Sequence, residues 1–313
     1  MMNNNLAIIY DDRFNLHKPG LYHPENPNRL VSIMDHLREE SFLEEVQTIK
    51  PFKAEDKDIL SVHTKENFNL IKEAIKEKRP ALDSDTYLSV DSLTASLLAA
   101  GSGIKAIELV MNGEYQNVFC AVRPPGHHAE SSRSMGFCLF NNIAIAAQYS
   151  ISNYGIERAA IIDFDVHHGN GTQEIFYGTD KVYYISLHQF PLYPGTGTSK
   201  EKGKGEGLGF TLNFPISPGS DGNIYRKYFE EDILKELEIY KPQIVFLSAG
   251  FDAHKDDPLA NINLTEKDFS IITSLIRNYA SANNISIISM LEGGYSLEAL
   301  SRSVFEHVKV LAS

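Results

Sequence analysis

The sequence has few cysteines, only two among its 313 residues, too few for a disulfide framework. Cys120 and Cys138 both lie in apolar surroundings, so we expect buried free thiols in a reducing compartment. The first residues carry no basic stretch followed by an apolar core, and no apolar run reaches the roughly 18 residues that a membrane-spanning helix needs. We therefore expect a cytoplasmic protein with neither a signal peptide nor a membrane span.

Positive charge is also scarce. The chain has 29 Lys and Arg against 41 Asp and Glu, which gives a formal net charge of −12. Phosphate binding needs a basic patch, so this balance argues against nucleic acid as the direct ligand. An acidic surface suits a cationic substrate, although it usually serves only solubility. With 42% hydrophobic and 22% charged residues, the composition is that of an ordinary globular protein.

Short apolar segments alternate with longer amphipathic ones along the chain. The predicted strands, rich in Ile, Val and Phe, are Leu6–Tyr10, Asn117–Val122, Ala159–Phe164, Val182–Leu187, Phe210–Pro215, Ile244–Ser248 and Ile285–Leu291. The predicted helices are Pro27–Glu40, Thr64–Lys78, Val90–Met111, Phe140–Tyr154, Gly222–Tyr240, Thr265–Ala282 and Leu297–Leu311. Asp91 and Thr265 are expected N-caps, and Thr265 with Asp268 resembles a capping box.

This alternation predicts an α/β fold, with a parallel sheet covered by helices on both faces. The glycine-rich segment Pro194–Gly209 is interpreted as a long loop and not as a domain linker. No internal repeat and no domain boundary is evident. We therefore expect a single domain over residues 1–313.

Polar residues gather where several of the predicted strands end. These segments are Arg123–His128, Asp163–Gly171, Ser186–His188, Ser248–Asp252 and Leu291–Tyr295. In sheets of this kind, ligands bind beyond the carboxyl ends of the strands. The pattern therefore predicts one site to which all five segments contribute.

Asp165 and His167 are two residues apart, so in an extended segment their side chains point to the same side. Asp252, at the end of another strand, can supply a third ligand. Two carboxylates and one imidazole form a mixed oxygen and nitrogen set, typical of a catalytic zinc or iron site. The alternative is that Asp163, Asp165 and Asp252 only cap helices or satisfy loop amides. We favour the metal site, because unpaired charges are costly within such apolar strands.

His127 and His128 follow Pro124-Pro125-Gly126, a segment that predicts a rigid turn. A lone histidine is more often structural, but a pair facing a metal suits proton transfer near neutral pH. Tyr295 follows two glycines, which we expect to leave the phenol on a flexible arm. A phenol can donate a hydrogen bond to a developing oxyanion, although a turn tyrosine would be the default interpretation.

Together these segments resemble the histone deacetylase family. The matching pieces run from His23–Arg29 to Glu292–Tyr295, which is nearly the whole chain. The resemblance implies the arginase–deacetylase fold, an eight-stranded parallel sheet with helices on both faces. Asn170 and the Glu292–Tyr295 segment look like the class II branch of the family and its bacterial histone deacetylase-like amidohydrolases.

The resemblance also implies a role for each site residue. Asp165, His167 and Asp252 match the zinc ligands, His127 and His128 the catalytic histidines, Asp163 and Asn170 their partners, and Tyr295 the transition-state tyrosine. The implied substrate-binding residues are Asp85, Gly136, Phe137, Tyr193, Leu259 and Gly294, with Arg29 lining an internal channel. Tyr193 stands where the family usually has Phe. One potassium site is implied at Asp163, Asp165, His167, Ser186 and Leu187, and a second, more weakly, at Phe176, Thr179, Val182 and Phe210.

The implied activity is zinc-dependent hydrolysis of the acetyl-lysine amide in a protein or peptide. The class II likeness makes His127 the base and His128 the acid, but Asp163 would raise the pKa of His127, so the roles could be shared. An acetylpolyamine amidohydrolase is an alternative. Leu259 favours acyl-lysine, since polyamine-selective relatives can place Glu there. An inactive acyl-lysine-binding scaffold is a further alternative, against which the intact metal ligands, histidines and Tyr295 argue.

Overall fold

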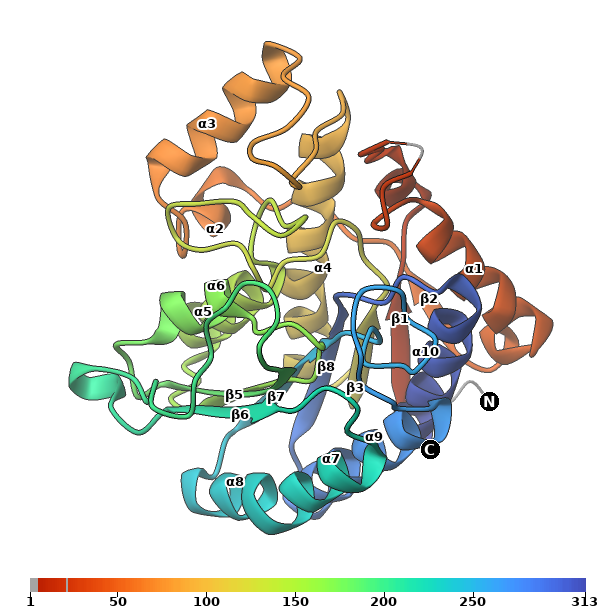
Figure 1. The fold of residues 1–313 in the computed structure, drawn as a ribbon, viewed down its shortest axis with the longest axis vertical. Helices are drawn as coiled ribbons and strands as arrows, with labels where there is room; N and C mark the ends of the chain where they lie inside the picture. The colour runs from red at the N-terminus through yellow and green to blue at the C-terminus, as the bar shows by residue number, and fades with distance from the viewer. Residues whose placement is uncertain (1–4, 21) are drawn as a thin grey trace.

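A computed structural model of the protein describes residues 5–20 and 22–313. One sheet of eight parallel strands runs through the molecule in the order β2-β1-β3-β8-β7-β4-β5-β6 (Figure 1). The strands are β1 Leu6–Ile9, β2 Gln47–Ile49, β3 Asn117–Cys120, β4 Ala159–Asp163, β5 Val182–Gln189, β6 Thr211–Ile216, β7 Ile244–Ala249 and β8 Ser286–Leu291. The predicted α/β fold class is therefore confirmed, including the eight-stranded parallel sheet.

Helices cover both faces of this sheet (Figure 1). They are α1 Asn28–Glu39, α2 Asp56–Ile59, α3 Lys65–Lys76, α4 Ser92–Met111, α5 Asn142–Tyr154, α6 Asn170–Phe176, α7 Gly222–Tyr228, α8 Leu234–Tyr240, α9 Glu266–Ala282 and α10 Leu297–Ala312. Neighbouring residues of a strand point to opposite faces. Thus the Phe119 ring lies 5.8 Å from His307 of α10, whereas the Cys120 thiol lies 3.6 Å from the Ser102 carbonyl of α4.

Two predicted helix starts have different outcomes. The Asp268 carboxylate accepts the Thr265 backbone N–H at 2.8 Å, and the predicted capping box is present at the start of α9. Asp91 occupies the N-cap position of α4, but its side chain makes no capping hydrogen bond. The hydroxyl of Ser92, the first residue of α4, accepts the backbone N–H of Ser89 in the preceding turn at 2.7 Å. Both cysteines are buried free thiols, as expected.

Helix α4 corrects one expectation from the sequence. It is 20 residues long and, by length and composition alone, apolar enough to cross a membrane, with a mean hydropathy of 1.4 over its most apolar window. The expectation that no segment of this kind exists was therefore wrong. Inside the protein, 72% of that window is buried, and the buried core helix of a soluble protein passes the same test.

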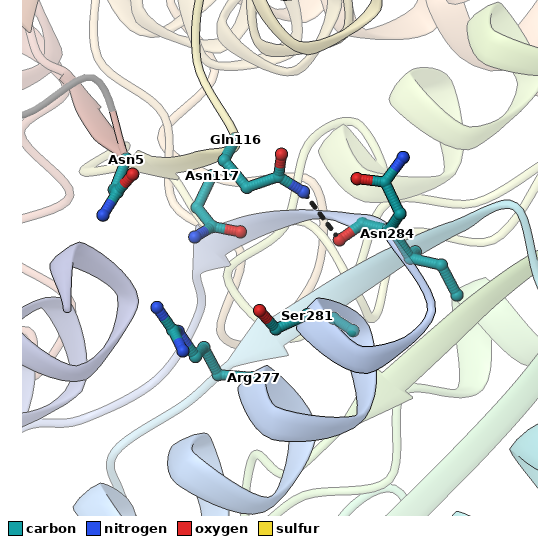
Figure 2. A pocket seen from close by; sticks show the side chains of 8 residues that line it. Asn5, Gln116, Asn117, Arg277, Ser281 and Asn284 are labelled. Atoms are coloured by element: carbon teal, nitrogen blue, oxygen red, sulfur yellow. Dashed lines mark hydrogen bonds between the residues drawn. The ribbon is translucent and has the colours of Figure 1, made fainter.

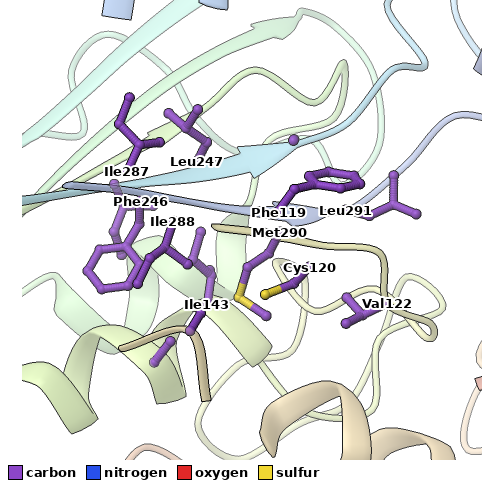
Figure 3. Packing of buried hydrophobic residues seen from close by; sticks show 14 of the residues in the cluster. Phe119, Cys120, Val122, Ile143, Phe246, Leu247, Ile287, Ile288, Met290 and Leu291 are labelled. Carbon is purple, nitrogen blue, oxygen red and sulfur yellow. The ribbon is translucent and has the colours of Figure 1, made fainter. Parts of the chain in front are cut away.

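The centre of the sheet is packed with large apolar side chains. Figure 3 shows Phe246 of β7, Ile288 of β8 and Ile143 of α5 lying together between the sheet and the helix. All three are fully buried. Because such interiors are close-packed, a truncation here leaves a cavity that the neighbours fill only in part.

We expect Phe246→Ala to lower the free energy of unfolding by about 3–5 kcal/mol, the usual cost of removing a fully buried phenyl group. Urea unfolding followed by circular dichroism measures the change. Val90→Ala is the control, because Val90 is 73% exposed and should cost less than about 0.5 kcal/mol. Equal losses for the two variants would contradict the packing described here.

Candidate active site

Four adjacent strands direct their carboxyl ends toward one place. Segments Arg123–His128, Asp163–Gly171, Ser248–Asp252 and Leu291–Tyr295 follow or end β3, β4, β7 and β8, which are neighbours in the order β3-β8-β7-β4. Segment Ser186–His188 was expected to end its strand, but it lies inside β5, which continues to Gln189. The polar segments converge because parallel strands present the same end to the same edge of the sheet.

Asp165, His167 and Asp252 form a buried cluster in which one ligand atom from each lies within 4.8 Å of the others. His167 Nδ1 lies 3.1 Å from both Asp165 Oδ1 and Asp252 Oδ2. Glycines make room for the carboxylates. A Cβ at Gly250 would lie 2.0 Å from Asp165 Oδ2, and one at Gly293 would lie 2.1 Å from Asp252 Oδ2.

The charges of this cluster fit a bound cation. Burial and the neighbouring Asp165 raise the pKa of Asp252 to about 7. Burial lowers the pKa of His167, but hydrogen bonds to Asp165 and Asp252 prevail and raise it to about 10. The carboxylates of Asp165 and Asp252 thus favour a positive charge between them, and a bound divalent ion can supply that charge. One nitrogen and two oxygen donors suit zinc or iron.

The histidine pair lies beside the cluster, with the two rings 4.0 Å apart. His127 Nδ1 is 3.0 Å from Asp163 Oδ2, and His128 Nδ1 is 2.8 Å from Asn170 Oδ1. Both predicted pairings are therefore present. His127 Nε2 also comes within 3.9 Å of Asp165 Oδ1.

Different partners give the two imidazoles different charge preferences. Burial lowers the pKa of His127, but Asp163 and Asp165 outweigh it and raise the pKa to about 10. For His128, burial is the largest cause, and the positive charges of His127 and His167 add to it, so the pKa falls well below its usual value. His127 therefore favours the imidazolium form and His128 the neutral form.

A cavity of about 200 Å³ reaches His167 of the Asp165–His167–Asp252 cluster and His128 of the histidine pair. Its lining residues are Asp85, His128, Gly136, Phe137, His167, Leu192, Tyr193, Leu259 and Tyr295. Gly294 was expected to bind substrate but does not line this cavity. Its carbonyl accepts a hydrogen bond from Arg29 Nε at 2.6 Å. Leu192 was not predicted, because a single leucine in a long loop carries no distinguishing signal.

The backbone at Gly136 and Phe137 is unusual, with φ values of 58° and 69°. A Cβ at Gly136 would lie 2.5 Å from the His128 ring, so only glycine lets this loop pass so close to the histidine. The Tyr193 ring, which also lines the cavity, lies 5.1 Å from the ring of His128. The two predicted aromatic walls, Phe137 and Tyr193, therefore both border the cavity.

Tyr295 does not sit on a flexible arm, and that expectation was wrong. Its backbone N–H donates to Asp257 Oδ2 at 2.7 Å, the Arg29 guanidinium lies 5.0 Å from its ring centroid, and the Phe137 ring packs 5.9 Å away. Burial raises the pKa of its hydroxyl well above the usual value, so the phenol remains a hydrogen-bond donor. Asp257, which holds both Tyr295 and Leu259 through their backbone N–H groups, had no assigned role.

A buried ionic network lies behind Tyr295. Arg29 Nη1 is 3.3 Å and Arg123 Nη2 is 2.8 Å from the carboxylate of Glu25, and all three side chains are fully buried. Burial raises the pKa of Glu25, but Arg123 outweighs it and brings the pKa to about 2. Glu292 Oε2 accepts the backbone N–H groups of Gly126 and His127 at 2.6 and 3.2 Å. Arg29 was predicted to line an internal channel, which stays a prediction, and no role was assigned to Glu25, Arg123 or Glu292.

The residues proposed for potassium lie in two places. Ser186 and Leu187 are in β5, and Ser186 is the register partner of Asp163 in β4. The weaker set, Phe176, Thr179, Val182 and Phe210, lies at the opposite ends of the strands, since Val182 begins β5. Both sets remain predictions of potassium sites.

Another cavity, of about 190 Å³, lies at the amino ends of β3 and β8 (Figure 2). Amide and hydroxyl side chains and Arg277 line it, and Gln116 Nε2 donates across it to the Ile285 carbonyl at 3.0 Å. It shares no residue with the cluster of Asp165, His167 and Asp252, and it lies at the opposite ends of the strands. Ligand sites in parallel sheets form at the carboxyl ends of the strands, so we assign this cavity no catalytic role.

Comparisons with known proteins agree over nearly the whole chain. Residues 23–311 match the family model described as histone deacetylase domain. A "probable deacetylase" of Archaeoglobus fulgidus is 41% identical over 297 residues, covering 93% of this chain and 82% of its own. The histone deacetylase HDA1 of Saccharomyces cerevisiae is 36% identical over 92% of this chain and 44% of its own. The crystal structure of the HDA15 HD domain superposes with a TM-score of 0.94 at 35% identity, covering 98% of this chain and 88% of that one.

Proposed function

Because the chain belongs to the histone deacetylase family, we propose that it uses one zinc ion to hydrolyse the side-chain amide of acetyl-lysine in proteins or peptides. The observation that carries this proposal is the buried cluster of Asp165, His167 and Asp252, whose His167 lines the 200 Å³ cavity. A cavity of this size, bordered by Phe137 and Tyr193, suits an extended acyl-lysine side chain. The Asp85 carboxylate, which lines the cavity, can accept N–H groups of the substrate backbone.

The residues of the site divide the chemistry among them. Zinc held by the three ligands would act as a Lewis acid, polarising the acetyl carbonyl and lowering the pKa of water. His128, neutral at rest, accepts the proton of the attacking water at Nε2 as the C–O bond forms. Tyr295 donates a hydrogen bond to the developing oxyanion. His127, kept cationic by Asp163, donates a proton to the amine nitrogen as the C–N bond breaks, releasing acetate.

This assignment reverses the one implied by the class II likeness, in which His127 is the base. The reason is the partner of each ring: His127 pairs with a carboxylate, which favours the cation, and His128 pairs with a neutral amide. A base must be neutral before the reaction begins. His128 meets that requirement better.

A fluorogenic acetyl-lysine peptide assay, with and without a chelator, tests the proposed function. We expect turnover that a chelator abolishes and added zinc restores. Turnover that survives complete metal removal would contradict the zinc requirement. Turnover of acetylated polyamines without peptide turnover would favour the polyamine alternative, and no turnover of either would favour a binding scaffold.

Leu259 provides a test of substrate choice. It borders the cavity and is half-buried, where a carboxylate would attract a distal ammonium by about 1 kcal/mol because solvent screens the charge. We expect Leu259→Glu to shift the ratio of kcat/KM toward acetylspermidine by about 5- to 10-fold. Leu259→Gln is the control, because it adds similar bulk without charge and should shift the ratio less than about 2-fold. A wild type that already prefers acetylspermidine would overturn the interpretation of Leu259.

A further inference from the structure

The amide of Asn170 lies between His128 and a carboxylate that the reaction scheme above does not use. Asn170 Oδ1 is 2.8 Å from His128 Nδ1, and Asn170 Nδ2 is 2.8 Å from Glu130 Oε1. The Asn170 amide group therefore connects the histidine to a negative charge two residues further along the chain. Asn170 is buried and begins α6, which fixes its position beside both partners.

The chemistry of the three groups allows only one arrangement of hydrogens. An ionised carboxylate can only accept hydrogen bonds, so Glu130 must face the NH₂ group of Asn170. The Asn170 oxygen must then face His128, and an oxygen can only accept. His128 Nδ1 must therefore carry a hydrogen, and the neutral ring has its lone pair at Nε2.

Two backbone contacts fix the main chain at Glu130. Its backbone N–H donates to the Arg133 carbonyl at 2.8 Å, and its own carbonyl lies 3.0 Å from His63 Nδ1. Glu130, which is half-buried, and Asn170 line a separate cavity of about 330 Å³. Two weaker acceptors, the His128 carbonyl at 3.5 Å and Met135 Sδ at 3.4 Å, also lie near Asn170 Nδ2.

We propose that Glu130 is a positioning residue for the hydrolysis: it fixes the orientation of the Asn170 amide and thereby keeps His128 in the tautomer whose Nε2 can accept a proton. The proposal rests on the proposed function in taking His128 as the base. It differs from the arrangement at His127, where the carboxylate of Asp163 contacts the ring directly. At His128 the carboxylate of Glu130 does not contact the ring. It acts through the intervening amide of Asn170, whose orientation it selects.

Glu130→Lys is the decisive substitution, because it replaces an acceptor by a donor at the same place. Glu130→Ala is less informative, since the two weaker acceptors can still hold the amide. The lysine should turn the Asn170 oxygen toward itself, leave the NH₂ group facing His128 Nδ1, and trap the ring with its hydrogen on Nε2. We expect kcat to fall about 10²-fold, the lower end of what a general base contributes, with KM changed less than about 3-fold.

The double variant Glu130→Lys/Asn170→Asp separates this role from a merely structural one. An aspartate at 170 can accept from both His128 Nδ1 and the new lysine, so kcat should return to within about 10-fold of wild type. Asn170→Asp alone should be less active than the double variant, because it places two carboxylates in contact. Glu174→Lys is the matched control, since Glu174 lines the same cavity but contacts Ser131 and not Asn170. It should lower kcat less than about 3-fold.

Nitrogen-15 NMR of the histidine rings gives a readout independent of activity. We expect the Nδ1–H tautomer of His128 in wild type and the Nε2–H tautomer in Glu130→Lys, with equal zinc content and melting temperature. The same tautomer in both, or a double variant no better than Glu130→Lys, would overturn the proposal. If wild type hydrolyses no acetyl-lysine peptide yet the tautomers differ as expected, the proposed function fails and the role of Glu130 in orienting the amide stands.

Discussion

Asp252→Ala is expected to lose bound zinc and hydrolytic activity together. Asp165 and His167 alone would remain, and two ligands do not hold a tight zinc site. Metal catalysis supplies several kcal/mol of charge stabilisation, so kcat should fall by at least about 10³-fold, at roughly 1.4 kcal/mol for each factor of ten. Elemental analysis of the purified variant, together with the peptide assay, measures both quantities on one sample.

A neighbouring substitution controls for damage to the loop. Asp256→Ala removes a carboxylate from the same segment. The Asp256 side chain, however, is 53% exposed and does not belong to the cluster of Asp165, His167 and Asp252. It should keep full zinc and activity within about 2-fold. Asp252 Oδ1 also accepts the Val166 backbone N–H at 2.8 Å, so the melting temperature of Asp252→Ala should be recorded. A folded Asp252→Ala protein with a full complement of zinc would refute the ligand assignment.

The sequence predicted the buried strands well, because a strand covered on both faces is a nearly continuous apolar run. It missed β2, a strand of three residues, Gln47–Ile49, at the edge of the sheet with two exposed positions and hence no such run. It also missed α6, Asn170–Phe176, which begins on an Asn-Gly pair typical of turns. The predicted helix Gly222–Tyr240 is interrupted by a π-helical turn at Phe229–Ile233, which apolar periodicity does not reveal.

The centre of the site was predictable because carboxylates and histidines stand out at the ends of apolar strands. The residues that hold them in place were not, because their contacts join distant parts of the chain. Asp257 binds the Tyr295 backbone 38 residues away, and Glu25 meets Arg123 98 residues away. The error about Tyr295 has the same origin: Gly293 and Gly294 indicate local freedom, and contacts from other segments remove it.

The contacts around Tyr295 determine which effects a substitution of this residue can have. Asp257 holds its backbone, while Arg29 and Phe137 pack against its ring, and none of the three depends on the hydroxyl group. Tyr295→Phe should therefore keep the ring, the cavity wall and the metal ligands in place. The variant removes one hydrogen-bond donor and nothing else.

We expect Tyr295→Phe to lower kcat by roughly 10²–10³-fold, since one oxyanion donor is typically worth that much, with zinc content unchanged. KM should change little, because the lost donor acts mainly on charge that develops after binding. Tyr225→Phe is the matched control: Tyr225 is fully buried, and its hydroxyl has no hydrogen-bond partner among the described residues. Steady-state kinetics on one acetyl-lysine peptide decide the matter. A raised KM at unchanged kcat would make Tyr295 a substrate-binding residue and would leave zinc and the histidine pair to stabilise the oxyanion.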